Sequence, residues 1–345
     1  EETVLRLNRS LYGMTRSPIH WFSALKTSLE ELGFVSSKND QCMFVNKKTG
    51  TIVLVYVDDC LCFGPNDATL DALVKELQAK HELGEEEISK DVYAYLGIEL
   101  DMTGDYIEMT QQGLIKKILE TTGMEDASPN EVPAKEVPLS PDKHGTEMDA
   151  DWDYSSVVGM LMYLTHTRPD IQFAVNQCAR FTHNPKLSHQ NAVKKICRYL
   201  SGTRDFGLRF SKKLGQDEIG VECYVDASFA PLWGYLDSDD VASSKSRTGY
   251  VIRIDDVPVA FASKPQGETA LSTTEAEYVA LSTAMRELLW VRRLVREIAD
   301  GIHVPYDAVT KIRSKVYEDN KGAIALAKRP DQTSRTRHLH TKYHF

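Results

Sequence analysis

One stretch of this sequence can form neither a helix nor a central strand. Pro129, Pro133, Pro138 and Pro141 fall within thirteen residues, inside the segment Glu125–Asp153, which carries nine acidic residues and two lysines. Proline lacks the amide hydrogen that helices and central strands require, so we expect a linker or an exposed loop here. The 345-residue chain should therefore consist of an N-terminal part and a longer C-terminal part.

The composition is that of a globular protein. Hydrophobic residues make up 42% and charged residues 26%, which excludes wholesale disorder. The longest purely apolar run near the middle of the first part, Ile52–Val57, is far shorter than the roughly 18 residues of a membrane helix. No leader opens the chain, and residue 1 is Glu rather than Met, so we interpret it as a piece of a longer intracellular protein, cytoplasmic or nuclear.

The cysteines indicate a reducing compartment. Six cysteines form no CxxC pair and no dense disulfide framework. Cys178, His183, His189 and Cys197 are one conceivable zinc site, but their spacings match no standard zinc knuckle. They also fall among apolar positions of expected helices, which favours ordinary core cysteines.

The charge distribution still allows nucleic acid to bind. The net charge of −9 argues mildly against a general polyanion binder. Residues 328–345, however, carry five Lys or Arg side chains against one aspartate. A local basic surface of this kind can contact phosphates even in an acidic protein.

Hydrophobic periodicity predicts alternating helices and strands. In the N-terminal part we expect a helix from Ser17-Pro18 to Gly33, strands within 51–63, a helix over 67–80, strands at 93–101 and 105–110 around Gly104, and a helix from 111 to 123. In the C-terminal part we expect helices at 154–165, 170–182 and 186–201, strands at 219–225, 248–254 and 257–263, a helix over 273–299, a strand at 314–318 and a helix at 320–328. This order predicts a mixed α/β sheet.

Two adjacent carboxylates, Asp58 and Asp59, follow the apolar run and precede Cys60–Phe63. At the tip of a buried hairpin they can present oxygens to Mg²⁺, although a plain turn is the alternative. Asp255-Asp256 provides an internal comparison, because it also separates two expected strands. There, polar alternation and Arg253 indicate a half-exposed surface hairpin, so a functional role is favoured only for the first pair.

Three further acids stand at the ends of expected elements: Asp226, Glu275 and Asp319. Each has an ordinary explanation, because Ser272 and Glu275 fit a capping box, Asp319 suits a helix N-cap and Asp226 suits a turn. Together, three acids around one α/β sheet are what a two-metal phosphodiester site needs.

A series of motifs resembles the reverse transcriptase region of copia-type retrotransposon polyproteins. They keep the family's order over nearly the whole chain: Leu11-Tyr12-Gly13, Ser17-Pro18, Trp21, Tyr56-Val57-Asp58-Asp59, Tyr95-Leu96-Gly97-Ile98-Glu99, Arg168-Pro169-Asp170, Arg198–Thr203, Ser246–Tyr250, Ala270–Tyr278, Asp319-Asn320, Ala323–Lys328 and Ser334–His338.

The resemblance implies an α+β and α/β multidomain protein. Its expected parts are a partial reverse transcriptase palm and thumb at 1–124, the acidic proline-rich linker at 125–153, a helical connection at 154–215, and a ribonuclease H-like domain at 216–345 without its C-terminal end. The implied function is RNA-directed DNA synthesis and cleavage of RNA in RNA–DNA hybrids. Its implied partners are an RNA template, a DNA primer, the RNA–DNA hybrid, deoxynucleoside triphosphates and the rest of the polyprotein.

The resemblance also implies roles for individual residues. Asp58 and Asp59 match two of three polymerase metal ligands, and Asp226, Glu275 and Asp319 match three of four ribonuclease H acids, with Mg²⁺ as cofactor and Mn²⁺ as a substitute. Gly13, Ser17 and Pro18 match the segment on the nucleotide and template side, and Leu96-Gly97 matches a hairpin that holds the primer.

The C-terminal histidines are open to two interpretations. His338, His340 and His344 do not share one helical face, so a metal site is disfavoured. Arg335 and Arg337, interleaved with Lys342 and Tyr343, favour a basic, aromatic nucleic-acid contact instead.

The sequence departs from the family at several positions. Thr15 and Arg16 replace the usual Lys and Gln, Ala227-Ser228-Phe229 lacks the usual Asp and Trp, and His340 replaces an Asp. We expect the third palm aspartate and the fourth ribonuclease H acid to lie outside these 345 residues. The alternative to an enzyme is therefore a degenerate copy that at most binds nucleic acid.

Overall fold

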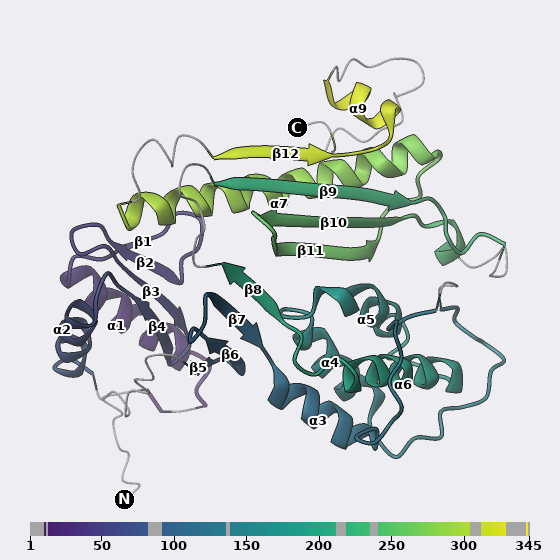
Figure 1. Cartoon of the computed structure of the whole chain (residues 1–345), viewed down its shortest axis with the longest axis horizontal. Coiled ribbons are helices and arrows are strands. Elements are labelled where there is room, and N and C mark those ends of the chain that lie inside the picture. Colours follow the sequence, from purple (N-terminus) through teal and green to yellow (C-terminus); the bar gives the residue numbers. More distant parts are fainter. Residues whose placement is uncertain are drawn as a thin grey trace, which may run out of the picture. The chain divides into compact units, whose positions relative to one another are not determined.

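The computed structural model describes residues 10–11, 13–81, 92–135, 139–211, 219–234, 241–303, 312–328 and 343. The chain divides into two compact units, Glu1–Ile88 with Trp290–Ile312, and Ser89–Leu289 with Arg313–Phe345. The domain boundaries expected at residues 124, 153 and 215 stay predictions. Both combine helices with antiparallel or mixed sheets, so the expected mixture of α and β structure is confirmed (Figure 1).

The first unit is built on a four-stranded antiparallel sheet in the order β1-β2-β3-β4. Its strands are β1 (Val35–Ser36), β2 (Met43–Asn46), β3 (Thr51–Tyr56) and β4 (Asp59–Phe63). One face packs against α1 (Ser17–Glu31) and α2 (Asp67–Gln78) through Leu25, Leu29, Phe44, Val53, Val55, Leu73 and Leu77.

The opposite face of this sheet is also covered. Met43, Val45 and Ile52 pack against Leu294 and Ile298, near the end of the 29-residue helix α7 (Thr273–Gly301). Successive strand residues point to opposite faces, so burial on both faces requires apolar residues at every position. This explains why the run before Asp58 shows no alternation.

The second unit begins with an antiparallel sheet in the order β5-β6-β7-β8. Its strands are β5 (Val92–Tyr95), β6 (Ile98–Asp101), β7 (Tyr106–Thr110) and β8 (Leu208–Ser211). The single strand expected over 93–101 is wrong, because the chain turns back at Leu96 and Gly97, which both have positive φ. The short strands β1, β2 and β8 were also missed, since two to four residues carry too little periodicity.

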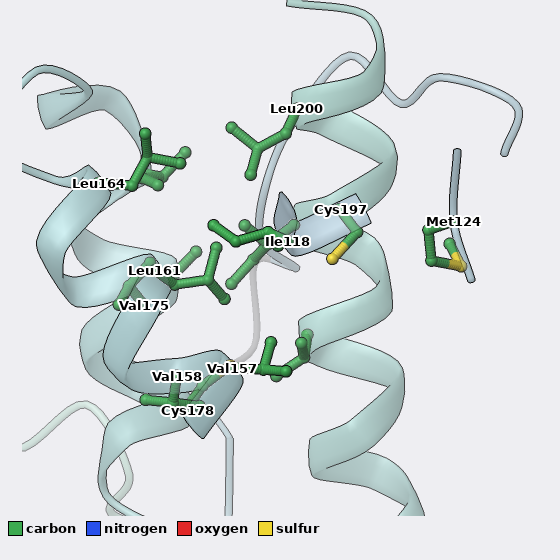
Figure 2. Close-up of a cluster of buried hydrophobic side chains, with 14 of the residues drawn as sticks. Ile118, Met124, Val157, Val158, Leu161, Leu164, Val175, Cys178, Cys197 and Leu200 are labelled. Atoms are coloured by element: carbon green, nitrogen blue, oxygen red, sulfur yellow. The ribbon is translucent and has the colours of Figure 1, made fainter. Parts of the chain in front are cut away.

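Four helices form the core of the second unit. They are α3 (Gln112–Thr122), α4 (Tyr154–Leu164), α5 (Gln172–Ala179) and α6 (Leu187–Ser201), and a 3₁₀ turn, Pro169–Ile171, precedes α5. Figure 2 shows Ile118, Leu161 and Leu200 meeting between the helices, and each is 0% exposed. Because α3 shares this core, it belongs with the helices that follow the proline-rich segment.

The proline-rich segment is packed against these helices. Its described residues, 125–135 and 139–153, contain no helix or strand, only a bridge from Glu147 to Lys186. Leu139 and Trp152 nevertheless contact the helical core, and the Leu187 amide donates to the Thr146 carbonyl at 2.9 Å. The sequence predicted a linker or an exposed loop, and the described residues of the segment form an irregular strap along the helices.

A buried arginine joins the end of α4 to the end of α6. Arg168 is 1% exposed and donates to Asp170, with Nη2–Oδ2 at 2.7 Å, and to the Thr203 carbonyl at 2.8 Å. Its guanidinium also lies 5.5 Å from the ring centroids of Tyr199 and Phe206. Because a buried cation needs full pairing, this arrangement explains the Arg168-Pro169-Asp170 motif structurally.

The third sheet has the order β11-β10-β9-β12. Its strands are β9 (Gly220–Ser228), β10 (Arg247–Ile254), β11 (Val257–Pro265) and β12 (Arg313–Tyr317), followed by α9 (Lys321–Lys328), while the 3₁₀ turn Val241–Ser244 precedes β10. β12 runs parallel to β9, and the other neighbours are antiparallel (Figure 1). The expected hairpin at Asp255-Asp256 is confirmed, with Ile254 opposite Val257.

Within the described parts of the chain, no helix combines the length and the apolar character that crossing a lipid bilayer would demand.

The helical core predicts a matched pair of mutational effects on neighbouring residues. Leu161→Ala empties a position that is 0% exposed and should lower the free energy of unfolding by about 2–5 kcal/mol. Met162→Ala, at a position 53% exposed on the same helix, should change it by less than about 0.5 kcal/mol. Urea denaturation of both variants tests this, and equal losses would contradict the core assignment.

Candidate functional site

Three carboxylates meet where the third sheet ends. The ligand oxygens of Asp226, Glu277 and Asp319 all lie within 4.8 Å of one another, the only such group of three among the described residues. Tyr224 pairs with Tyr317 in the parallel register of β9 and β12. Two residues further on, Asp226 and Asp319 therefore reach the same edge of the sheet. Glu277 comes from the beginning of α7.

Glu277 is the buried member of this group. It is 7% exposed, whereas Asp226 and Asp319 are both exposed. Burial, followed by the nearby charges of Glu318, Asp226 and Asp319, raises its pKa to about 7, and the backbone of Ala227 opposes this rise. A carboxyl group with this pKa is poised to change its charge near neutral pH.

Two carboxylate oxygens here have no hydrogen-bond partner among the described residues. They are Oε2 of Glu277 and Oε2 of the neighbouring Glu318, and both are buried. Burial and the charges of Asp319 and Asp226 also raise the pKa of Glu318. A buried acceptor oxygen without a hydrogen-bond donor raises the free energy of the folded state. A hard divalent cation, which prefers oxygen ligands, can take the place of the missing donor. The residues present therefore fit Mg²⁺ or Mn²⁺.

Glu277 takes the place in this group that the sequence suggested for Glu275. Glu275 Oε2 instead accepts from the Leu271 amide at 2.7 Å, and its own amide donates to Ser272 Oγ at 3.1 Å. These contacts resemble the capping box considered as the ordinary explanation, with the returning hydrogen bond made to the amide of Leu271, one residue before Ser272. Positions two apart on a helix point about 200° away from each other, so only one of the two glutamates can face the aspartates.

A signal for Glu277 was present in the sequence. Glu277 lies on the same side of α7 as three apolar residues that follow it by four, seven and eleven positions. These residues, Leu281, Ala284 and Leu288, are all buried. A glutamate on the buried stripe of a helix requires a special explanation, whereas one beside an N-cap serine does not.

The pair Asp58 and Asp59 lies at the tip of the β3–β4 hairpin, as expected. Asp59 pairs with Tyr56, so Val57 and Asp58 form the turn, and both aspartates are exposed. Val57 has a φ of +54°, which is strained for a β-branched residue. The indole of Trp21 donates to the Val57 carbonyl at 2.6 Å and fixes the turn to α1. Among the described residues, no third acid joins this pair in a metal-sized group.

The expected nucleic-acid contacts are only partly described. Gly13 has a φ of +90° in the turn that leads into α1, where Ser17 Oγ donates to the Leu11 carbonyl at 2.6 Å and Pro18 is the second helical residue. Leu96 and Gly97 form the turn between β5 and β6. Arg335 and Arg337, like His338, His340 and His344, lie outside the described residues.

The structure favours core cysteines over the zinc alternative. Cys178 and Cys197 are 1% and 0% exposed, and burial raises their pKa values to about 12 and about 11, which disfavours the thiolate that binds zinc. His189 is already engaged, since Nδ1 accepts from the Lys186 amide at 2.9 Å and Nε2 lies 2.7 Å from the Ser140 carbonyl.

The comparison pair, Asp255-Asp256, has the features of a surface turn. Asp256 forms an ion pair with Arg253 of the same hairpin and is almost fully exposed. It therefore provides a control position away from the three-carboxylate group.

Comparison with known proteins points to one family. A family model described as reverse transcriptase (RNA-dependent DNA polymerase) matches residues 1–136. The retrovirus-related Pol polyprotein from transposon RE2 of Arabidopsis thaliana is 34% identical over 99% of this chain and 22% of its own length. The corresponding polyprotein from transposon TNT 1-94 of Nicotiana tabacum is 32% identical over 99% of this chain and 25% of its own length.

A more distant relative is similar over much of the same region. The transposon Ty1-DR6 Gag-Pol polyprotein of Saccharomyces cerevisiae is 24% identical over 86% of this chain and 17% of its own length. The chain thus spans about a fifth to a quarter of the length of the plant polyproteins.

The raised pKa of Glu277 predicts how stability depends on pH. Because this pKa is about 7 in the folded chain and near 4.5 when unfolded, the folded state holds the extra proton between these values. Stability should fall as pH rises from about 5 to about 8 without divalent cations, by about 1–3 kcal/mol. Glu277→Gln should remove this fall, measured by urea denaturation across the pH range.

Glu275→Gln is the matched control for this measurement, because glutamine can accept the same capping hydrogen bond. It should keep the pH dependence of the original chain. A loss of that dependence in Glu275→Gln, with its retention in Glu277→Gln, would contradict the assignment.

Proposed function

The chain belongs to the reverse transcriptase family of copia-type retrotransposon Pol polyproteins, and we propose that it contributes both polymerase and ribonuclease H chemistry to such a polyprotein. Its substrates in this proposal are an RNA template, a DNA primer with deoxynucleoside triphosphates, and the RNA strand of the resulting hybrid. The rest of the polyprotein is its proposed partner.

The observation that carries the ribonuclease H proposal is the group Asp226, Glu277 and Asp319. Bound Mg²⁺ would supply a water of lowered pKa and stabilise the charge on the leaving oxygen. The two exposed aspartates present carboxylates toward the solvent side, where a phosphodiester would approach. No described residue donates a hydrogen bond to Oε2 of Glu277, so this oxygen would be free to hold a cation from the buried side.

The burial of Glu277 is consistent with this role. A raised pKa makes the empty site partly protonated at neutral pH, and cation binding would displace that proton.

The polymerase proposal rests on Asp58 and Asp59. They lie at the end of β3, which is packed on both faces, so the sheet sets their positions, and the Trp21 hydrogen bond fixes the turn itself. In the proposal both carboxylates hold Mg²⁺ for attack of the primer 3′ hydroxyl, while Gly13, Ser17 and Pro18 border the template and the Leu96-Gly97 turn contacts the primer. Arg335 and Arg337 are proposed as further phosphate contacts.

The test of the ribonuclease H proposal is cleavage of an RNA–DNA hybrid. The chain should cut the RNA strand in the presence of Mg²⁺, and Asp226→Asn or Glu277→Gln should lower the rate by at least about 100-fold, because each removes a charged ligand oxygen. Glu275→Gln and Asp256→Asn should keep it within about threefold. The rates are measured with an end-labelled RNA strand.

A second measurement, of metal binding, does not depend on RNA cleavage. Titration with Mn²⁺, followed by electron paramagnetic resonance, should give weaker binding in Asp226→Asn and Glu277→Gln but not in Glu275→Gln. Equal losses from Glu275→Gln and Glu277→Gln would refute the site. Hybrid binding without Mn²⁺ binding or cleavage would instead favour a nucleic-acid-binding remnant.

The polymerase proposal is tested in the same chain joined to its natural upstream segment. Asp58→Ala and Asp59→Ala should each abolish extension of a DNA primer on an RNA template, while Asp255→Ala, at the other hairpin tip, should have no effect. A gel-based extension assay distinguishes these outcomes. Extension that survives Asp58→Ala would remove this hairpin from the polymerase site.

A further inference from the structure

The turn between β5 and β6 is strained. Tyr95 opposite Ile98 is the last pair of the two strands, so Leu96 and Gly97 alone reverse the chain. Their φ angles are +53° and +71°, the left-handed values that a two-residue type I′ hairpin turn requires. Glycine adopts such a conformation without steric penalty, but leucine does not. The turn therefore needs support from elsewhere in the fold.

Tyr163 provides that support from a different element. Its phenol donates a hydrogen bond to the Leu96 carbonyl. Tyr163 lies in the last turn of α4, beside Leu161 and Leu164, which are both 0% exposed and anchor the helix in the helical core (Figure 2). The tyrosine itself is 38% exposed, so its hydroxyl reaches the turn from outside that core.

A second contact attaches the hairpin to the same group of helices. Glu99 in β6 accepts from the Gly113 amide in the first turn of α3 at 3.4 Å and from Thr110 at 3.3 Å. Glu99, which pairs with Ala94 next to the last strand pair, is thus fixed to α3, and the turn itself is held by α4. Removing the Tyr163 hydroxyl would release only the turn.

No part of the chain that the structure describes covers the outer side of the turn. A Cβ atom added at Gly97 would meet none of these atoms within 4 Å, and Gly97 is exposed. An uncovered backbone turn can lie directly against the sugar–phosphate backbone of a nucleic acid, where contacts position the strand without reading its sequence. The position of the turn then determines the position of the strand.

We propose that Tyr163 is a positioning residue that holds the Leu96-Gly97 turn in place against the primer strand. This inference rests on the proposed polymerase function. Without the hydroxyl, the strained turn samples other conformations, and the primer dissociates faster. Tyr163 does not touch the reacting atoms, so RNA cleavage at the three-carboxylate group is independent of it.

The test uses Tyr163→Phe in the full chain, because this change removes one oxygen and leaves the ring. Release of a fluorescent DNA primer annealed to an RNA template should be about three- to tenfold faster, as expected for one lost hydrogen bond. Amide hydrogen exchange in the peptide that contains Leu96 and Gly97 should accelerate. The melting temperature and the kcat for RNA cleavage should not change.

Tyr106→Phe is the matched control. Tyr106 lies in β7 of the same sheet and is 42% exposed. The guanidinium carbon of Arg209 lies 4.6 Å from the centroid of its ring. Removing the Tyr106 hydroxyl should change neither the rate of primer release nor amide hydrogen exchange at the Leu96-Gly97 turn.

The possible failures are distinguishable. A chain that does not bind the primer–template at all would overturn the proposed polymerase function, and this inference with it. Primer binding with unchanged release from Tyr163→Phe would overturn only the inference, whether or not exchange at the turn accelerates. Equal effects of Tyr163→Phe and Tyr106→Phe would overturn it as well.

Discussion

The parallel pairing of β9 with β12 is the constraint on which the candidate site depends. This register places Tyr224 beside Tyr317, and so brings Asp226 and Asp319 to one edge of the sheet although they are far apart in the sequence. A shift of one residue would send the acid of the shifted strand to the opposite face. The burial of Val221 and Cys223 makes such a shift of β9 costly, because the same shift would expose them.

The second constraint is the 3.6-residue period of helix α7, which determines which of its side chains face the sheet. Its first part belongs to the second unit and places Glu277 on the buried stripe next to the two aspartates. Its last part, from Trp290, belongs to the first unit, where Glu297 accepts from Ser37 Oγ at 2.7 Å and from Asn39 Nδ2 at 2.6 Å. One continuous helix thus supplies an acid to the site in one unit and covers a sheet face in the other.

Strained turns recur where nucleic acid is proposed to bind. Val57 and Leu96 both have positive φ values that their side chains disfavour, and each has its carbonyl oxygen bound by an aromatic side chain from a helix, Trp21 or Tyr163. Strain of this kind persists only where surrounding structure over-determines it. In both hairpins, therefore, a side chain from a helix fixes the turn by a single hydrogen bond.

The sequence by itself determined the order of helices, most strands and the acid-bearing hairpins, because these depend on local periodicity and turn chemistry. The Asp58-Asp59 tip followed from an unbroken apolar run, and the contrast with Asp255-Asp256 followed from alternation. Three features required tertiary structure: the packing of residues 125–135 and 139–153 along the helices, the turn at Leu96-Gly97, and the place of Glu277 instead of Glu275 beside the aspartates. Both glutamates satisfy a local helix pattern, and only the sheet edge that α7 meets decides which of them faces the aspartates.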